Sequence, residues 1–203
     1  MSTAETRNAG TTSLLLIQLV IGYEWLVSAL TKLVRGDFPA GLAAQLGDMS
    51  NDAPGWYRGL LTGVVLPHAV AFGYAIEIAE LVAGAVLVGL AFVLLVRPEL
   101  ELPRPAIVAA VVASAAALVM VANFELANGA GFGRSLGQDT FDEGVDLDTL
   151  MTGLQLALLL FWGAALRRSF AQEPSSKSRR TSLSAMRSWL SSRQPTISGV
   201  GKP

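Results

Sequence analysis

The sequence predicts an all-α membrane protein, a bundle of four transmembrane helices with short interfacial helices in the first outer loop. Of the 203 residues, 52% are hydrophobic and 15% are charged. The charged residues lie mainly outside four long apolar runs, at residues 12–34, 68–96, 105–126 and 147–166. Because about 20 apolar residues in a helix cross a hydrocarbon core about 30 Å thick, each run is long enough to span a bilayer. Little chain remains for a soluble domain.

Lysine and arginine are distributed unevenly among the segments that connect these runs. Eleven of them lie before the first run, between the second and third, or after the fourth, whereas three lie in the other two loops. Because cytoplasmic segments carry the excess of basic residues, we expect both termini in the cytoplasm of a multi-pass protein of the cell membrane. We divide the chain into a cytoplasmic leader at residues 1–11, a transmembrane domain at residues 12–170 and a basic, serine-rich cytoplasmic tail at residues 171–203.

The first run carries its polar residues on one face. On a helix, Glu24, Ser28, Thr31 and Lys32 lie within an arc of about 100°. Lys32 is close enough to the outer end to extend its ammonium group to the interface, whereas Glu24 lies about 12 Å deeper at about 1.5 Å per residue. A carboxylate at that depth usually turns toward the bundle interior or a wet cavity. Glu24 is therefore a candidate site residue, and Lys32 either joins it or extends to the interface.

The first outer loop, residues 35–63, has its own helical pattern. Phe38, Leu42 and Leu46 recur at a spacing of four after a proline that favours a helix start. Asn51 or Asp52 can cap a second short helix further along the loop. We expect both helices to lie at the outer interface as a lid over the bundle, or, as the alternative, to pack there without gating.

The second run, residues 68–96, contains the strongest functional signal. Its only charged residues are Glu77 and Glu80, which lie about 60° apart on a helix and share a face with Gly73 and Gly84. Buried acids are costly to keep for packing alone. The run therefore predicts an intramembrane polar site, with simple hydrogen bonding to neighbouring helices as the alternative.

The third and fourth runs contribute fewer polar residues. The third is rich in alanine at spacings of three and four, which favours close helix packing. Asn123 lies near its outer end, and Gln155 lies one to two turns below the outer end of the fourth run. The loop between them is rich in glycine and acidic residues, and we interpret it as a solvated loop rather than a phosphate or cation site.

The predicted topology brings the polar residues of all four helices to related depths. Helices 1 and 3 run outward and helices 2 and 4 run inward, so their outer halves lie side by side. Sites in four-helix bundles are formed in this way by inward-facing residues of several helices. We assign the catalytic, proton-exchanging role to Glu24, Glu77 and Glu80, and a role in binding a cofactor to Lys32, His68, Asn123 and Gln155.

The composition limits the cofactors. The chain has no cysteine, which excludes thiolate-bound iron–sulfur clusters and cysteine-ligated zinc. His68 is the single histidine, so one chain cannot supply two histidines to a haem. We expect no metal, haem or iron–sulfur cluster, and an organic carrier or a partner's cofactor if electrons pass through the protein.

Three segments resemble the DoxX/DoxD family of small four-helix membrane proteins. They are EWLVSALTKL at residues 24–33, FPAGL at residues 38–42 and EIAELVAGAVLVG at residues 77–89. The similarity covers roughly residues 14–166. It implies a membrane subunit of a quinone-linked redox complex, as in the small subunit of a thiosulfate:quinone oxidoreductase. It further implies quinone as the cofactor and a second extracytoplasmic or membrane redox subunit as the partner.

One position departs from the family pattern. Asp142 and Glu143 stand where the family has an acidic pair before its last helix, but Gly144 follows them instead of histidine. The sequence also leaves two other functions open. One is a non-catalytic anchor or assembly subunit whose buried acids specify helix packing, and the other is a small proton-coupled carrier, which the lack of an obvious inverted repeat disfavours.

The remaining partners follow from the tail and the surface. Leu183, Met186, Trp189 and Leu190 recur at helical spacing among basic residues. This pattern predicts a helix on the anionic inner leaflet, with plain disorder as the alternative. We expect the lipid bilayer as a partner, allow a homo-oligomer, and expect no nucleic acid.

Overall fold

The computed structural model describes residues 3–51, 53–127, 129 and 147–171. In chain order the elements are α1 (Thr3–Arg35), α2 (Phe38–Met49), α3 (Gly55–Leu60), the π-helix η1 (Leu61–Val65), the 3-10 helix η2 (Leu66–His68), α4 (Ala69–Val96), α5 (Arg104–Ala127) and α6 (Leu147–Ala171). The described residues contain no strand. Four candidate membrane spans occur among them, at Ala9–Arg35, Gly55–Val96, Arg104–Ala127 and Thr149–Ala171. The predicted all-α, four-helix membrane fold is confirmed, and the chain is a multi-pass membrane protein.

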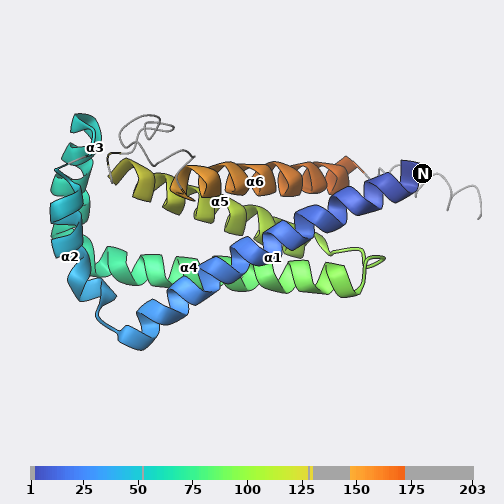
Figure 1. The fold of residues 1–203 in the computed structure, drawn as a ribbon, viewed down its shortest axis with the longest axis horizontal. Helices are drawn as coiled ribbons and strands as arrows, with labels where there is room; N and C mark the ends of the chain where they lie inside the picture. Colours follow the sequence, from blue (N-terminus) through green and yellow to red (C-terminus); the bar gives the residue numbers. More distant parts are fainter. Residues whose placement is uncertain (1–2, 52, 128, 130–146, 172–203) are drawn as a thin grey trace, which may run out of the picture. The chain divides into compact units, whose positions relative to one another are not determined.

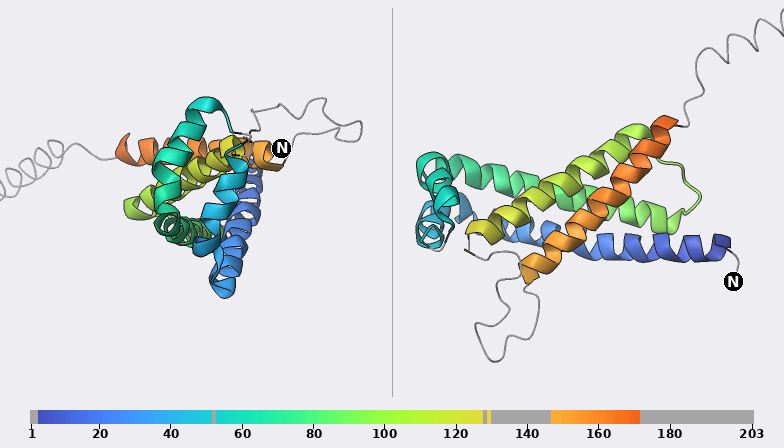
Figure 2. Two further views of the ribbon diagram at one scale, coloured as in Figure 1. Left: turned by 90° about the vertical axis from the view of Figure 1, so that its left-hand side faces the viewer. Right: turned by 90° about the horizontal axis from the view of Figure 1, so that it is seen from above.

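Residues up to Leu166 form one compact unit, and residues from Arg167 onward form a second. Within the first unit, α1 and α4 lie against each other and α5 packs on α4, whereas α6 crosses α1 and α4 obliquely (Figures 1 and 2). Helices α2 and α3 lie across one end of the long helices (Figures 1 and 2). The predicted short helices of the first loop are therefore present at that end. The acidic loop with Asp142, Glu143 and Gly144, and the tail, lie outside the described residues.

Two local expectations differ from the structure. The first helix begins at Thr3 and not near residue 12, because the polar leader contains helix-favouring alanine, glutamate and arginine and has no proline. The second short helix has Pro54 at its N-cap and no side-chain cap bond, so Asn51 does not cap it. A proline disfavours helical geometry in the residue before it, which moves the helix start past Ala53. Asp52 lies outside the described residues.

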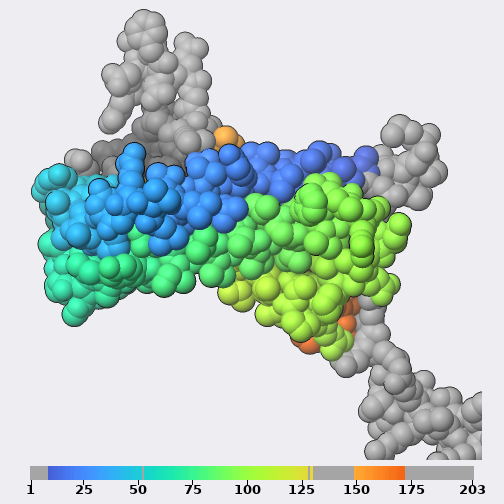
Figure 3. All heavy atoms as spheres, turned by 90° about the horizontal axis from the view of Figure 1, so that it is seen from below, coloured from blue at the N-terminus to red at the C-terminus, as the bar shows by residue number. Residues whose placement is uncertain are grey.

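Glycine brings α1 and α4 close together. A Cβ atom placed on Gly84 would lie 2.6 Å from the backbone nitrogen of Leu26, and one on Gly22 would lie 2.9 Å from the Cβ of Leu87. Side chains larger than hydrogen do not fit at such distances, and small residues allow this kind of approach between membrane helices. The two helices lie against each other in the space-filling view (Figure 3).

The start of α4 meets α2 in the same way. A Cβ atom on Gly73 would lie 2.5 Å from the Cα of Pro39. The buried face of α4 also includes Glu77, Glu80 and Gly84. The sequence prediction that the two acids and the two glycines share one face is confirmed, and that face packs against α1 and α2.

The core of the bundle combines an apolar cluster with one buried hydrogen-bond relay. Side chains of α1, α4, α5 and α6 form the cluster, namely Ile21, Trp25, Ala83, Leu87, Ala113, Ala117, Val121 and Leu158. Gln18, which is fully buried, donates from Nε2 to the carbonyl oxygen of Leu87 at 2.8 Å. Its Oε1 accepts from the indole Nε1 of Trp162 at 2.9 Å. Because an unpaired buried amide is costly, this relay stabilises the arrangement of α1, α4 and α6.

Candidate functional site

A buried ion pair joins α1 to α4 at the predicted site. Glu80 is 1% exposed and its Oε1 pairs with the ammonium group of Lys32. The hydroxyl of Ser28 donates to Oε2 of Glu80 at 3.2 Å. Both carboxylate oxygens of Glu80 therefore have a partner on α1, and Lys32 joins the site instead of extending to the interface.

Two aromatic rings lie close to the ammonium group of Lys32. Its Nζ lies 4.5 Å from the ring centroid of Phe38 and 5.8 Å from that of Phe124. A cation in this position is attracted to the negative ring faces. Because Phe38 is the first residue of α2, these contacts also tie the short helices at the end of the bundle to the ion pair.

Glu77 lies one helical turn before Glu80 and is differently placed. Its side chain is 2% exposed, and its Oε1 has no hydrogen-bond partner among the described residues. An unsatisfied buried oxygen costs about 1–3 kcal/mol, so this carboxyl group is not explained by packing alone. Glu77 is thus a buried acid with one unpaired oxygen, next to Glu80, whose two oxygens are both paired.

Glu24 lies near the middle of the candidate span Ala9–Arg35, on the side of α1 that carries Lys32. Its side chain is exposed, and no hydrogen bond or ion pair joins it to another described residue. It lines a groove of about 260 Å³ together with Lys32 and Glu80. The walls of the groove are mainly apolar and aromatic, formed by Trp25, Val121, Phe124 and Met151.

A second hollow of about 470 Å³ adjoins this groove. It shares Glu24, Ser28 and Lys32 with the groove, and it is also lined by polar side chains near the C-terminal end of α1, namely Arg35, Asp37 and Gln45. Polar and apolar side chains both line this hollow, which extends from the end of α1 to the three shared residues. The arrangement suits proton exchange between the groove and that end of the bundle.

Two predicted site residues lie away from the groove. His68 is the N-cap residue of α4, and its side chain is exposed. Gln155 is fully buried, and neither of its amide atoms has a partner among the described residues. Neither residue lines the groove. The sequence prediction compared only the depths of the residues along the helices. In the structure, the first turns of α4 lie against α2, where Gly73 meets Pro39, and His68 precedes these turns at a distance from the groove.

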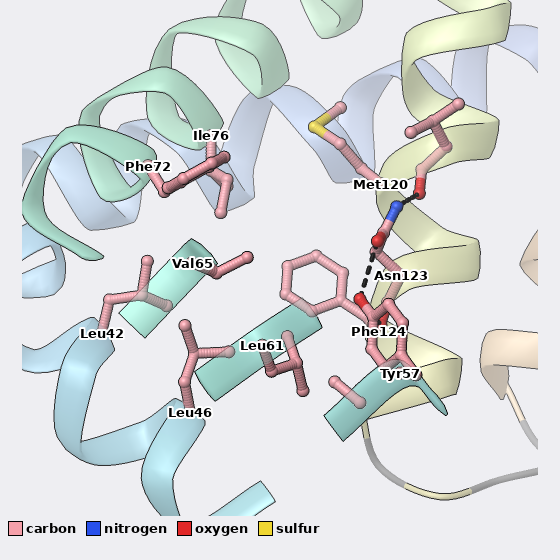
Figure 4. Close-up of a pocket in the computed structure, with 12 residues that line it drawn as sticks. Leu42, Leu46, Tyr57, Leu61, Val65, Phe72, Ile76, Met120, Asn123 and Phe124 are labelled. Atoms are coloured by element: carbon pink, nitrogen blue, oxygen red, sulfur yellow. Dashed lines mark hydrogen bonds between the residues drawn. The ribbon is translucent and has the colours of Figure 1, made fainter. Parts of the chain in front are cut away.

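Asn123 also lies apart from the carboxyl groups. Its Oδ1 accepts a hydrogen bond from the hydroxyl of Tyr57 at 2.7 Å, and its Nδ2 donates to the carbonyl oxygen of Val119 at 2.6 Å. Together with Tyr57 it lines an apolar cavity of about 210 Å³ under the short helices (Figure 4). The seven predicted residues are thus divided between a groove, a separate cavity, the protein interior and an exposed helix start.

Sequence reasoning missed a third buried acid. Glu125 is fully buried on α5 and accepts hydrogen bonds from the hydroxyls of Thr149 and Thr152 on α6. The sequence contains a signal for this contact: Glu125 lies at the end of the third apolar run, and Thr149 and Thr152 lie at the start of the fourth. The carboxylate of Glu125 is satisfied by hydroxyls, which is the pattern expected of a packing contact.

The described residues contain no group of three or more histidine, cysteine, aspartate or glutamate side chains that could hold a metal ion. Comparison of the chain with protein-family models, with curated proteins and with solved structures gives no match. The interpretation of the site therefore rests on its own geometry and on the resemblance described above.

Proposed function

We propose that this multi-pass membrane protein is a subunit of a quinone-linked redox complex and that its groove receives the quinone ring. The observation that carries the proposal is the groove itself. Carboxyl and ammonium groups of Glu24, Glu80 and Lys32 lie beside aromatic walls within the membrane-spanning helices. Ring-binding sites of this kind combine apolar surfaces with a few polar groups that set orientation.

The residues fit a quinone in two further respects. The indole Nε1 of Trp25, which lines the groove, is buried without a partner, and so is Oε1 of Glu77 nearby on the same face of α4 as Glu80. A bound quinone takes up two electrons and two protons, and each carbonyl oxygen becomes a hydroxyl. The electrons would come from the redox partner subunit.

The chain's own groups have separate tasks in this proposal. Lys32 donates hydrogen bonds and orients a carbonyl oxygen, while Phe124 and Trp25 present apolar ring surfaces. Glu77 and Glu24 hold and release protons, because neither is paired with a cation among the described residues. The adjoining polar hollow supplies protons from the end of α1.

We also propose that the chain is DoxX/DoxD-like and lies in the cell membrane with both termini in the cytoplasm. Its partner subunit would oxidise thiosulfate or a related sulfur compound. The three segments that resemble the family meet at the same place. Residues 24–33 supply Glu24 and Lys32, residues 38–42 begin α2, and residues 77–89 supply Glu80. This convergence supports the family proposal because residues 77–89 lie far from the other two segments in the sequence.

The test is quinone-analogue reduction per assembled complex in native membranes. Glu77→Gln nearly preserves shape and removes proton exchange, so we expect turnover to fall sharply at an unchanged amount of complex. Glu80→Gln is combined with Lys32→Gln, so that no unpaired charge is left in the interior. The matched control is Glu99→Gln in the exposed connection between α4 and α5, which should leave turnover unchanged.

The main alternative is a non-catalytic anchor or assembly subunit. It is favoured by Glu80, whose two carboxylate oxygens are both engaged by α1, as expected of a contact that joins two helices. In that case turnover would follow only the amount of folded complex. Normal turnover in Glu77→Gln and in the Lys32→Gln, Glu80→Gln variant would reject the redox site and favour the anchor.

A further inference from the structure

An apolar cavity of about 210 Å³ lies beneath the short helices at the end of the bundle (Figure 4). Aliphatic side chains line it from several elements, among them Leu42 and Leu46 of α2, Leu61 and Val65 of η1, and Ile76 of α4. The π-helix η1 has a wider helical turn than the α-helices around it, and π turns of this kind are frequent at functional sites. The cavity is thus formed where the helix geometry departs from regular packing.

The polar groups in the lining are already paired with protein atoms. Tyr57 donates to Asn123, and Asn123 donates to the carbonyl oxygen of Val119. The cavity therefore offers little to a polar headgroup and suits an apolar occupant. A cavity of about 150 Å³ lined by apolar side chains binds benzene, so this one has room for about one to two isoprene units.

Phe124 separates the cavity from the groove that holds the ion pair. Its side chain lines both, and in Figure 4 its ring points into the cavity. On the other side, the ammonium group of Lys32 lies 5.8 Å from the centroid of the same ring. A ligand whose ring lies beside Lys32 therefore has its side chain within one aromatic side chain of the cavity, and a rotation of Phe124 would join the two spaces.

We propose that this cavity binds the first isoprene units of the quinone side chain while the groove holds the ring. The inference rests on the proposed function and assigns a binding place to the isoprenoid side chain of the same ligand. The shared wall at Phe124 favours this occupant over a phospholipid acyl chain, because a polar ring site adjoins the cavity directly. Helices α2 and α3 then cover the side chain and keep it out of the surrounding lipid.

The experiment uses the full-length protein in lipid vesicles and a benzoquinone with a photoreactive group on its second isoprene unit. We expect labelling of residues of α2 and η1, identified by mass spectrometry. Ala127→Leu adds bulk inside the cavity and should lower this labelling about tenfold. The matched control is Ala44→Leu, which adds the same atoms on the exposed face of α2 and should leave labelling unchanged.

A second arm measures binding of a benzoquinone without a side chain. Ala127→Leu should leave this binding within about twofold, because the ring site is not filled. Two results would overturn the inference and leave the proposed function standing. In both, the ring binds; in one, labelling is spread over lipid-facing positions, and in the other, labelling is unchanged by Ala127→Leu. Absence of ring binding in the unmodified protein would overturn both. Equal labelling of the cavity by a phospholipid with a photoreactive acyl chain would replace the isoprenoid occupant with lipid.

Discussion

Replacing Gly84 with alanine tests whether glycine sets the distance between α1 and α4. The new Cβ atom would lie 2.6 Å from the backbone nitrogen of Leu26, whereas ordinary contact begins at 3.4 Å, so the helices must separate by about 0.8 Å. The obstacle is backbone, which cannot rotate away as a side chain can. Overpacking of this kind costs about 1–3 kcal/mol. Because Glu80 lies one turn from Gly84, the same displacement also lengthens its contacts with Ser28 and Lys32.

The measurement is the unfolding of the purified protein in mild detergent, followed by circular dichroism. Gly84→Ala should lower the free energy of unfolding by about 1–3 kcal/mol. Gly89→Ala is the matched control on the same helix, because a Cβ atom there has nothing within 4 Å. It should be neutral or slightly stabilising, since alanine favours the helix over glycine. Equal stability of Gly84→Ala and Gly89→Ala would show that the close approach of α1 and α4 is not a feature of the folded protein.

Two further predictions concern the ion pair and the topology. Lys32→Met should destabilise the bundle by about 3–5 kcal/mol because it leaves the carboxylate of Glu80 buried without its cation, and adding Glu80→Gln should recover most of that loss in the same unfolding assay. An additive double variant would show that the two groups do not interact. A reporter enzyme fused after Pro203 should be active in the cytoplasm, because basic residues are concentrated on that side. Activity only outside the cell would reverse the assigned orientation.

The sequence by itself determined the class of the fold and the composition of the central face of α4. Run lengths set the number of spans, and Pro39 marks the start of a short helix in the first loop. Glu77, Glu80 and their neighbouring glycines were placed on one buried face correctly, because the helical period depends only on residue spacing. For the same reason Glu24 and Lys32 were placed on one side of α1, and both line the groove.

Only the tertiary structure decided which of these residues meet. Depth along the membrane does not determine which side chains meet, because two helices at the same depth can be offset or rotated. His68 and Gln155 do not line the groove. The glycine contacts set the offset between α1 and α4, and this offset places Lys32 against Glu80 and leaves Glu77 without a cation. The pairing of Asn123 with Tyr57 depends on how α3 folds back over α5, which no local periodicity encodes.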